Sequence, residues 1–163
     1  MNPRRALIPS LVSVLALVAV CASASAQQWQ VFEEESVSLD YRNAADTESV
    51  FSVLCGARHS DITIPLAPGI KPPAQAPELR VTEPTGVIAI KLRWDVCGGE
   101  MTCTDRPNGD VSTYYVKAND KQVALRFADK ASSIAIDAPG IRLTAAADAK
   151  AFARFAALCR KQK

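Results

Sequence analysis

The stretch from residue 85 to residue 116, TGVIAIKLRWDVCGGEMTCTDRPNGDVSTYYV, decides the fold class. Residues 86–96 alternate between apolar and polar, and the apolar side chains share one face: Ile88, Ile90, Leu92, Trp94 and Val96. A glycine-containing polar segment follows, and residues 111–116 are rich in β-branched and aromatic side chains. Two such runs separated by a turn region predict a pair of antiparallel strands.

The first 26 residues are expected to be a cleaved secretory signal peptide. Two arginines at 4 and 5 precede a mostly apolar stretch at 6–20, and Ala-Ser-Ala at 24–26 makes an A-x-A cleavage site. The apolar stretch is shorter than the roughly 20 residues that span a bilayer. Lipidation at Cys21 is the alternative, but Val20 is not the small residue that lipoprotein signals place before that cysteine. The expected location is therefore the periplasm or the exterior, with no membrane span after cleavage.

The mature chain, residues 27–163, has the length of a single domain. Loss of the two signal arginines from the 19 Lys and Arg residues leaves 17 basic residues against 17 Asp and Glu residues. A neutral balance without a basic stripe argues against a nucleic-acid partner. The oligomeric state stays open.

Four cysteines remain in the mature chain: Cys55, Cys97, Cys103 and Cys159. An even number in an exported chain predicts two disulfide bonds, and three pairings are possible. We favour Cys97 with Cys103, which closes a short local loop, and hence Cys55 with Cys159.

The remaining sequence favours further strands before a long loop. Alternating apolar residues predict strands at 37–41, 50–55 and 62–66, and Pro65 suits a strand end or an edge. Six prolines between residues 65 and 84 predict a long surface loop in extended conformation.

The C-terminal part predicts two helices and two short strands. Residues 119–130 fit either a strand or a helix, and we favour a short helix capped near Asn119. Residues 133–137 and 141–143 predict strands around a turn at Pro139 and Gly140. Residues 145–160 predict a helix with one apolar side: Phe152, Phe155, Ala156 and Cys159. The expected fold is mainly β (α+β), an antiparallel, sandwich-like sheet with a C-terminal helix packed on it.

Catalysis is not expected. The single histidine, His59, lies in the turn Arg-His-Ser-Asp at 58–61, where adjacent side chains cannot relay a proton in line. No G-x-S-x-G motif is present. We expect His59 to be an exposed turn residue, and we expect no catalytic residue and no cofactor.

The candidate interaction site is the loop between the two strands of the opening stretch. Its residues are Asp95, Glu100, Met101, Asp105, Arg106 and Asp110. A disulfide-closed loop loses little entropy on binding, and acidic residues attract a basic partner. The hypotheses are therefore a non-enzymatic envelope protein that acts by protein–protein contact, or an inhibitor of a basic hydrolase such as lysozyme. The alternative of a soft-metal carrier, with Cu(I) held by Cys97, Met101, Cys103 and His59, is less favoured than a disulfide.

The order of elements also resembles two groups of small secreted bacterial proteins. Trp29 near the mature start, a strand ending at Leu54 and Cys55, the alternating residues 62–66 and a last helix ending in Cys159 look similar to the invasion-associated locus B proteins and the VasI-type accessory proteins of type VI secretion. The resemblance implies a β-sandwich-like periplasmic domain without catalytic residues, and it implies no particular ligand.

Overall fold

The computed structural model describes residues 28–42, 49–96 and 112–163. These residues form twelve elements, which in chain order are β1 (Gln28–Glu33), β2 (Val37–Arg42), β3 (Ser49–Cys55), β4 (Ser60–Pro65), β5 (Glu78–Glu83), β6 (Gly86–Lys91), β7 (Arg93–Val96), β8 (Ser112–Ala118), α1 (Gln122–Lys130), β9 (Ser133–Ala138), β10 (Ile141–Ala146) and α2 (Ala149–Lys161).

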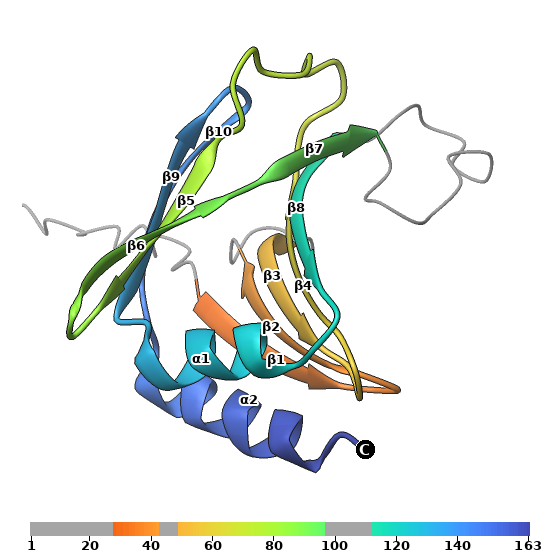
Figure 1. The fold of residues 1–163 in the computed structure, drawn as a ribbon, viewed down its shortest axis with the longest axis vertical. Helices are drawn as coiled ribbons and strands as arrows, with labels where there is room; N and C mark the ends of the chain where they lie inside the picture. Colours follow the sequence, from red (N-terminus) through yellow and green to blue (C-terminus); the bar gives the residue numbers. More distant parts are fainter. Residues whose placement is uncertain (1–27, 43–48, 97–111) are drawn as a thin grey trace, which may run out of the picture.

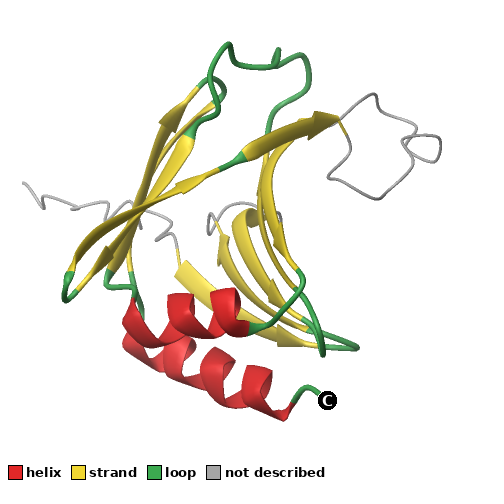
Figure 2. Ribbon diagram, viewed as in Figure 1, coloured by secondary structure: helices red, strands yellow, loops and turns green. Residues whose placement is uncertain are grey.

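The strands form two antiparallel sheets (Figure 1). One sheet has the order β1-β2-β3-β4-β8-β7, and the other has the order β10-β9-β5-β6. The sheets stand opposite each other, and both helices lie together below the space between them (Figure 2). Helix α1 packs on β3 and β4, and α2 packs on β1 and β2. The predicted fold class is confirmed: the chain is a sandwich-like antiparallel β structure with a C-terminal helix packed on it.

The strands predicted at 37–41, 50–55 and 62–66 are present as β2, β3 and β4. Their alternating apolar residues are buried between the sheets and the helices: Val37, Leu39, Tyr41, Phe51, Val53, Cys55, Ile62 and Ile64. Pro65 is the last residue of β4, the strand-end position expected for a residue that has no N–H to donate.

The single strand predicted for residues 86–96 is divided at Leu92. β6 pairs with β5 in one sheet, and β7 pairs with β8 in the other. Leu92 is buried between them and donates its N–H to the carbonyl oxygen of Pro77 at 2.9 Å. The predicted pairing with the following strand is thus correct for β7 and wrong for β6. Period-two alternation continues unbroken through the bend, so the sequence pattern carries no sign of it.

The proline-rich connection is shorter than expected because β5 interrupts it. This strand lies between β9 and β6, and its Leu79 and Val81 are buried. The prolines at 68, 72, 73 and 77 precede the strand, and Pro84 lies in the turn that follows it. None of them removes a donor from the ladder, so the strand forms despite the biased composition.

Strand β1 is not predicted from the sequence. It pairs with β2 along its whole length, yet Trp29 is its one fully buried residue. A strand with one buried side chain lacks the alternation on which the other predictions depend. Glu33 is exposed at the end of β1, and Glu34 and Glu35 are exposed in the turn that leads to β2.

Helix α1 confirms the helical interpretation of residues 119–130 but starts later than predicted. Lys121, not Asn119, precedes its first turn, and the carboxylate of Asp120 accepts the N–H of Gln122 at 2.8 Å. The predicted helical face is correct: Ala124, Phe127 and Ala128 are buried.

Helix α2 begins at Ala149 and not at residue 145, because β10 continues to Ala146. The side chain of Asp148 caps it by accepting the N–H of Ala151 at 2.8 Å. The four predicted apolar positions, from Phe152 to Cys159, are all buried.

Cys55 on β3 and Cys159 on α2 form a disulfide bond, with their Cα atoms 5.7 Å apart. This confirms the Cys55–Cys159 bond of the favoured pairing. Both cysteines are fully buried. The bond therefore joins the terminal helix to the middle of the six-stranded sheet.

Other predictions concern residues outside the described ranges. These are the signal peptide at 1–26, the alternative lipid site at Cys21, and the Cys97–Cys103 disulfide. In the parts of the chain that the structure does describe, no helix is long and apolar enough to cross a membrane.

Candidate functional site

The predicted interaction loop lies almost wholly outside the described residues. Asp95 is in the described backbone, where it is the third residue of β7 and lies opposite Thr113 of β8. The other members are not described: Glu100, Met101, Asp105, Arg106 and Asp110. Recognition through this loop stays a prediction.

His59 is half-buried, so the expectation of an exposed turn histidine is wrong. Its imidazole covers Gly56 so closely that a Cβ added there would overlap the ring atom Cε1. The neighbouring Ser60 donates its hydroxyl proton to the carbonyl oxygen of Asp120 at 2.7 Å. Because that proton is directed to a backbone oxygen, this turn holds no activated serine nucleophile.

A metal site does not emerge from the described residues. Among them, no group of three or more His, Cys, Asp and Glu side chains is placed to hold a metal ion. The soft-metal alternative needs Cys97, Met101 and Cys103, which lie outside the described ranges.

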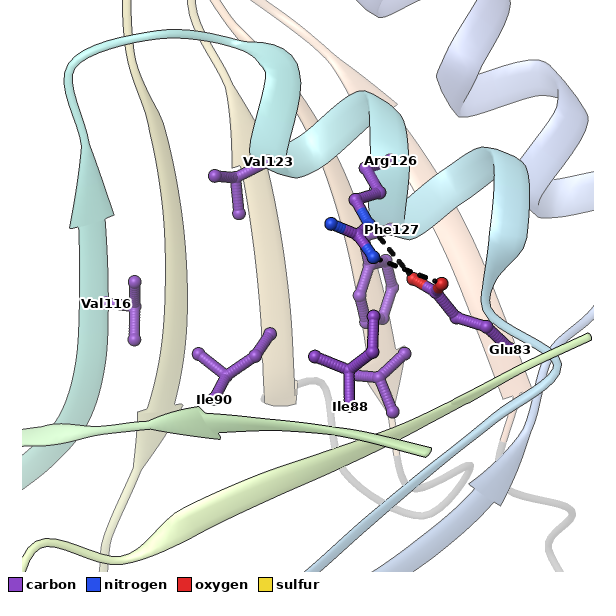
Figure 3. A pocket seen from close by; sticks show the side chains of 8 residues that line it. Glu83, Ile88, Ile90, Val116, Val123, Arg126 and Phe127 are labelled. Carbon is purple, nitrogen blue, oxygen red and sulfur yellow. Dashed lines mark hydrogen bonds and ion pairs between the residues drawn. The ribbon is translucent and has the colours of Figure 1, made fainter. Parts of the chain in front are cut away.

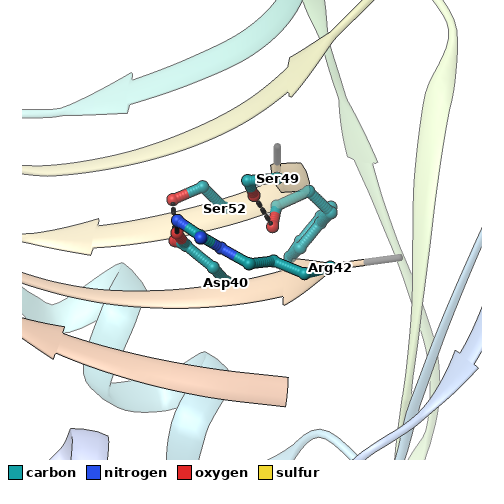
Figure 4. A network of polar contacts seen from close by, with 5 residues as sticks. Asp40, Arg42, Ser49 and Ser52 are labelled. Atoms are coloured by element: carbon teal, nitrogen blue, oxygen red, sulfur yellow. Dashed lines mark hydrogen bonds and ion pairs between the residues drawn. The ribbon is translucent and has the colours of Figure 1, made fainter. Parts of the chain in front are cut away.

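Asp40 on β2 is a buried carboxylate at the centre of a polar network (Figure 4). It accepts a hydrogen bond from the hydroxyl of Ser52 at 2.7 Å and one from Nη2 of Arg42 at 3.3 Å. The guanidinium carbon of Arg42 lies 4.3 Å from the centre of the Phe32 ring, within the range of a cation–π contact. Both carboxylate oxygens thus have donors. The network ties β1, β2 and β3 together, and we interpret it as structural.

An apolar cavity of about 230 Å³ opens between β5, β6, β8 and α1 (Figure 3). Its lining residues are Val81, Glu83, Ile88, Ile90, Val116, Val123, Arg126 and Phe127. Side chains of β6 and α1 point toward each other across it, Val116 closes one end, and a charged pair closes the other (Figure 3). An apolar cavity of about 150 Å³ is enough to bind benzene. This cavity therefore has room for an aliphatic or aromatic group.

The cavity follows from the division of residues 86–96 at Leu92. β7 pairs with β8 only as far as Tyr115, and the residues that precede Leu92 pair with β5 instead. Val116 lies just beyond the last β7–β8 pair, where β8 has no partner on its β7 side. The space between the diverging strands is backed by α1.

Glu83 and Arg126 form the charged end of the cavity. Nε of Arg126 donates to Oε1 of Glu83 at 3.2 Å, and Nη2 donates to Oε2 at 3.3 Å. The Glu83 side chain is only 3% exposed, whereas that of Arg126 is 58% exposed. The arginine neutralises the buried carboxylate with two of its five N–H donors. The other three remain at the mouth of the cavity.

The backbone of β6 also faces this opening. In an antiparallel pair, opposed residues alternate between hydrogen-bonded and non-hydrogen-bonded positions. Leu92 bonds to Pro77, so the pair Ile90–Leu79, two positions back, is also hydrogen-bonded and the pair Ala89–Arg80 is not. The N–H and C=O groups of Val87, Ala89 and Lys91 therefore point away from β5. Among the described residues, no strand pairs with that edge.

Sequence reasoning placed Ile88 and Ile90 on one face of a strand and did not find the cavity. A weaker signal was present: Pro84 and Gly86 mark a turn between two alternating runs. A β5–β6 hairpin uses one edge of β6 and leaves the other edge open.

No family model, no curated protein and no solved structure matches this chain. The functional argument therefore depends on the residues themselves. The resemblance to the locus B and VasI-type proteins stays a prediction.

Proposed function

We propose that this chain is a non-enzymatic, extracytoplasmic protein that acts by binding another protein of the envelope. The contact is strand addition: an extended segment of the partner pairs with the open edge of β6. The observation that carries the proposal is the coincidence of this edge with the apolar cavity beside it. In strand addition, main-chain hydrogen bonds supply affinity, and pockets for alternate side chains supply specificity.

The exposure of β6 supports the proposal. Val87 is 63% exposed, and among the described residues it is the one large hydrophobic side chain that is exposed. Exposed edge strands invite pairing with another chain, and proteins usually blunt or cover them. An added strand would pair the outward N–H and C=O groups of β6 and place alternate side chains in the cavity.

The compartment is supported by two observations. The sequence of residues 1–26 has the pattern of a secretory signal, and Cys55 and Cys159 are joined by a disulfide. Structural disulfides persist in oxidising compartments and are rare in the cytosol. The lysozyme-inhibitor and copper alternatives depend on residues 95–110, nearly all outside the described ranges, and no described contact favours either.

The test replaces Ala89, whose exposed side chain contributes little and whose N–H points to the open edge. Ala89→Pro removes that N–H without touching the bonds between β5 and β6, and Ala89→Ser is the matched control that keeps it. Each variant is immobilised and exposed to an envelope extract of the source organism. We expect a protein captured by the wild type and by Ala89→Ser but not by Ala89→Pro.

Equal capture by Ala89→Pro, or no capture by the wild type, would overturn the proposal. Far-ultraviolet circular dichroism and thermal unfolding check that the variants are folded. If Ala89→Pro does not fold, Lys91→Pro removes the next outward N–H of the same edge and is judged by the same outcomes.

A further inference from the structure

The side chain of Arg126 is the one charged group at the cavity with donors to spare. Two N–H groups bind Glu83 side-on, and the opposite end of the guanidinium points away from that carboxylate (Figure 3). A second carboxylate can bind this free end while Glu83 keeps the first. Charge-assisted hydrogen bonds from arginine are among the strongest in proteins.

The charges near the cavity favour an acidic ligand. Lys130 follows Arg126 by one helical turn on the same face of α1 and is exposed. The nearby carboxylate of Asp129 is already bound to Arg160, with both oxygens 2.7 Å from its Nη2. On the β6 side, exposed Lys91 lies opposite Glu78, so their charges offset each other. The uncompensated charge at this opening is therefore positive and lies on α1.

The register of β6 determines the positions at which the apolar and acidic side chains of an added strand would lie. Ile90 and Ile88 point into the cavity, and Gly86 is the next residue on that face. Gly86 has no side chain and pairs with Glu83, so it leaves space at the charged end. Residues of an added strand opposite Ile90 and Ile88 meet the apolar lining, and the residue opposite Gly86 meets Arg126.

Building on the proposed strand addition, we infer that the partner segment is an acidic–aliphatic peptide that runs antiparallel to β6. Its inward residues alternate as aliphatic, aliphatic, acidic, in the pattern Φ-x-Φ-x-Glu, where Φ is a residue of about the size of valine. Antiparallel pairing is the commoner arrangement, and it brings the acidic residue last, at the Gly86 end. The cavity volume of about 230 Å³ limits the aliphatic residues to this size.

The experiment measures binding of two fluorescent peptides by anisotropy. One is acetyl-Thr-Val-Thr-Val-Thr-Glu-Thr-amide, and its matched control carries Lys in place of Glu. We expect the Glu peptide to bind about tenfold more tightly, since a hydrogen bond to a charged group contributes a factor of about that size and the Lys peptide meets repulsion at the same place. The preference should shrink with added salt, because Arg126 is partly exposed.

Two variants separate the roles of the residues. In Glu83→Gln/Arg126→Gln the charges are removed together, so no buried carboxylate is left unpaired. We expect this variant to lose most of the preference for the Glu peptide and to keep only the part that Lys130 contributes. Lys130→Gln removes the neighbouring charge. It should reduce the preference for the Glu peptide, but by a smaller factor than the double change does.

The outcomes distinguish this inference from the function on which it rests. If both peptides bind equally and Ala89→Pro abolishes both, strand addition stands and the acidic preference is wrong. If neither peptide binds, or Ala89→Pro binds as the wild type does, the peptide inference is overturned. Decanoate is included as a probe, and its binding in the absence of peptide binding would assign the cavity to a small amphiphile instead.

Discussion

The indole Nε1 of Trp29 donates a hydrogen bond to the carbonyl oxygen of Ala146, 2.7 Å away and 117 residues later in the chain. Trp29 lies on β1 and Ala146 ends β10, so the bond joins an edge of one sheet to an edge of the other. The opposite edges, β6 and β7, are joined through Leu92. The two sheets are thus held together at both sides.

Replacement of Trp29 tests the first of these joints. Trp29→Phe removes the N–H donor but keeps an aromatic ring near Tyr41 and Phe152, whose ring centres lie 4.9 Å and 4.8 Å from that of Trp29. The carbonyl of Ala146 loses its partner and the core loses volume, so we expect the free energy of unfolding to fall by about 2 kcal/mol. Urea unfolding measures it.

Trp94 is the matched control for this change. Its Nε1 is buried without a hydrogen-bond partner among the described residues. Trp94→Phe therefore removes an unsatisfied donor and should cost less than Trp29→Phe, because only packing is lost. The chain has two tryptophans, so each variant retains one fluorescent reporter. An equal loss in both variants would contradict the role assigned to the Trp29–Ala146 bond.

Buried tyrosines predict a loss of stability at alkaline pH. Burial raises the pKa of Tyr41 and of Tyr114 above the ordinary value of 10.0. Above that pH the unfolded chain releases phenolic protons that the folded chain keeps, so ionisation favours unfolding. The stabilisation of the folded state by the two protonated tyrosines is fully present below pH 10. It is lost as the pH rises through their folded-state pKa. In that window each tyrosine adds up to about 1.4 kcal/mol of destabilisation per pH unit.

Tyr114→Phe isolates one of these groups. At pH 7 the variant should be less stable by about 1 kcal/mol, since the tyrosine hydroxyl donates to the carbonyl oxygen of Pro139 at 2.8 Å. The deficit should narrow as the pH rises above 10, because the variant has one phenol fewer to ionise. Urea unfolding between pH 7 and pH 11 measures both effects. Parallel stability curves for the two proteins would contradict the prediction.

Removal of the disulfide should be the costliest of these changes. Cys55 and Cys159 are 104 residues apart, and the chain-entropy model assigns about 4–5 kcal/mol to a loop of that length. Cys55→Ala/Cys159→Ala should lose that amount in urea unfolding. The sequence-predicted Cys97–Cys103 loop is much shorter, so Cys97→Ser/Cys103→Ser should lose roughly half as much. A non-reducing peptide map in which Cys55 is joined to another cysteine would contradict the assignment.

The predictable parts of the fold are those in which one face of an element is buried. β2, β3 and α2 follow from the spacing of apolar residues. Cysteine counting left three pairings open, and the Cys55–Cys159 bond belongs to the one that we favoured. β1 escaped prediction because Trp29 alone anchors it. The division at Leu92 escaped prediction because side-chain alternation continues through a bend that only the pairing partners reveal.

The candidate site was less predictable than the fold. Its apolar lining looks like core sequence, since Ile88 and Ile90 alternate as buried strand residues do. Its charged end brings together Glu83 and Arg126, which are 43 positions apart and carry no local motif. What opens the cavity is the choice of β5 over β8 as the partner of β6, and that choice is made by the tertiary structure.

The Cys55–Cys159 bond has one more consequence, for the response of the chain to proteolysis. A single cleavage between the two cysteines, for example in the proline-rich connection before β5, leaves both fragments covalently linked. The severed ends stay tethered near their native positions, and the sheets can close again around the cut. The cleaved chain can therefore keep its fold, whereas the two fragments of a sandwich without this bond would separate.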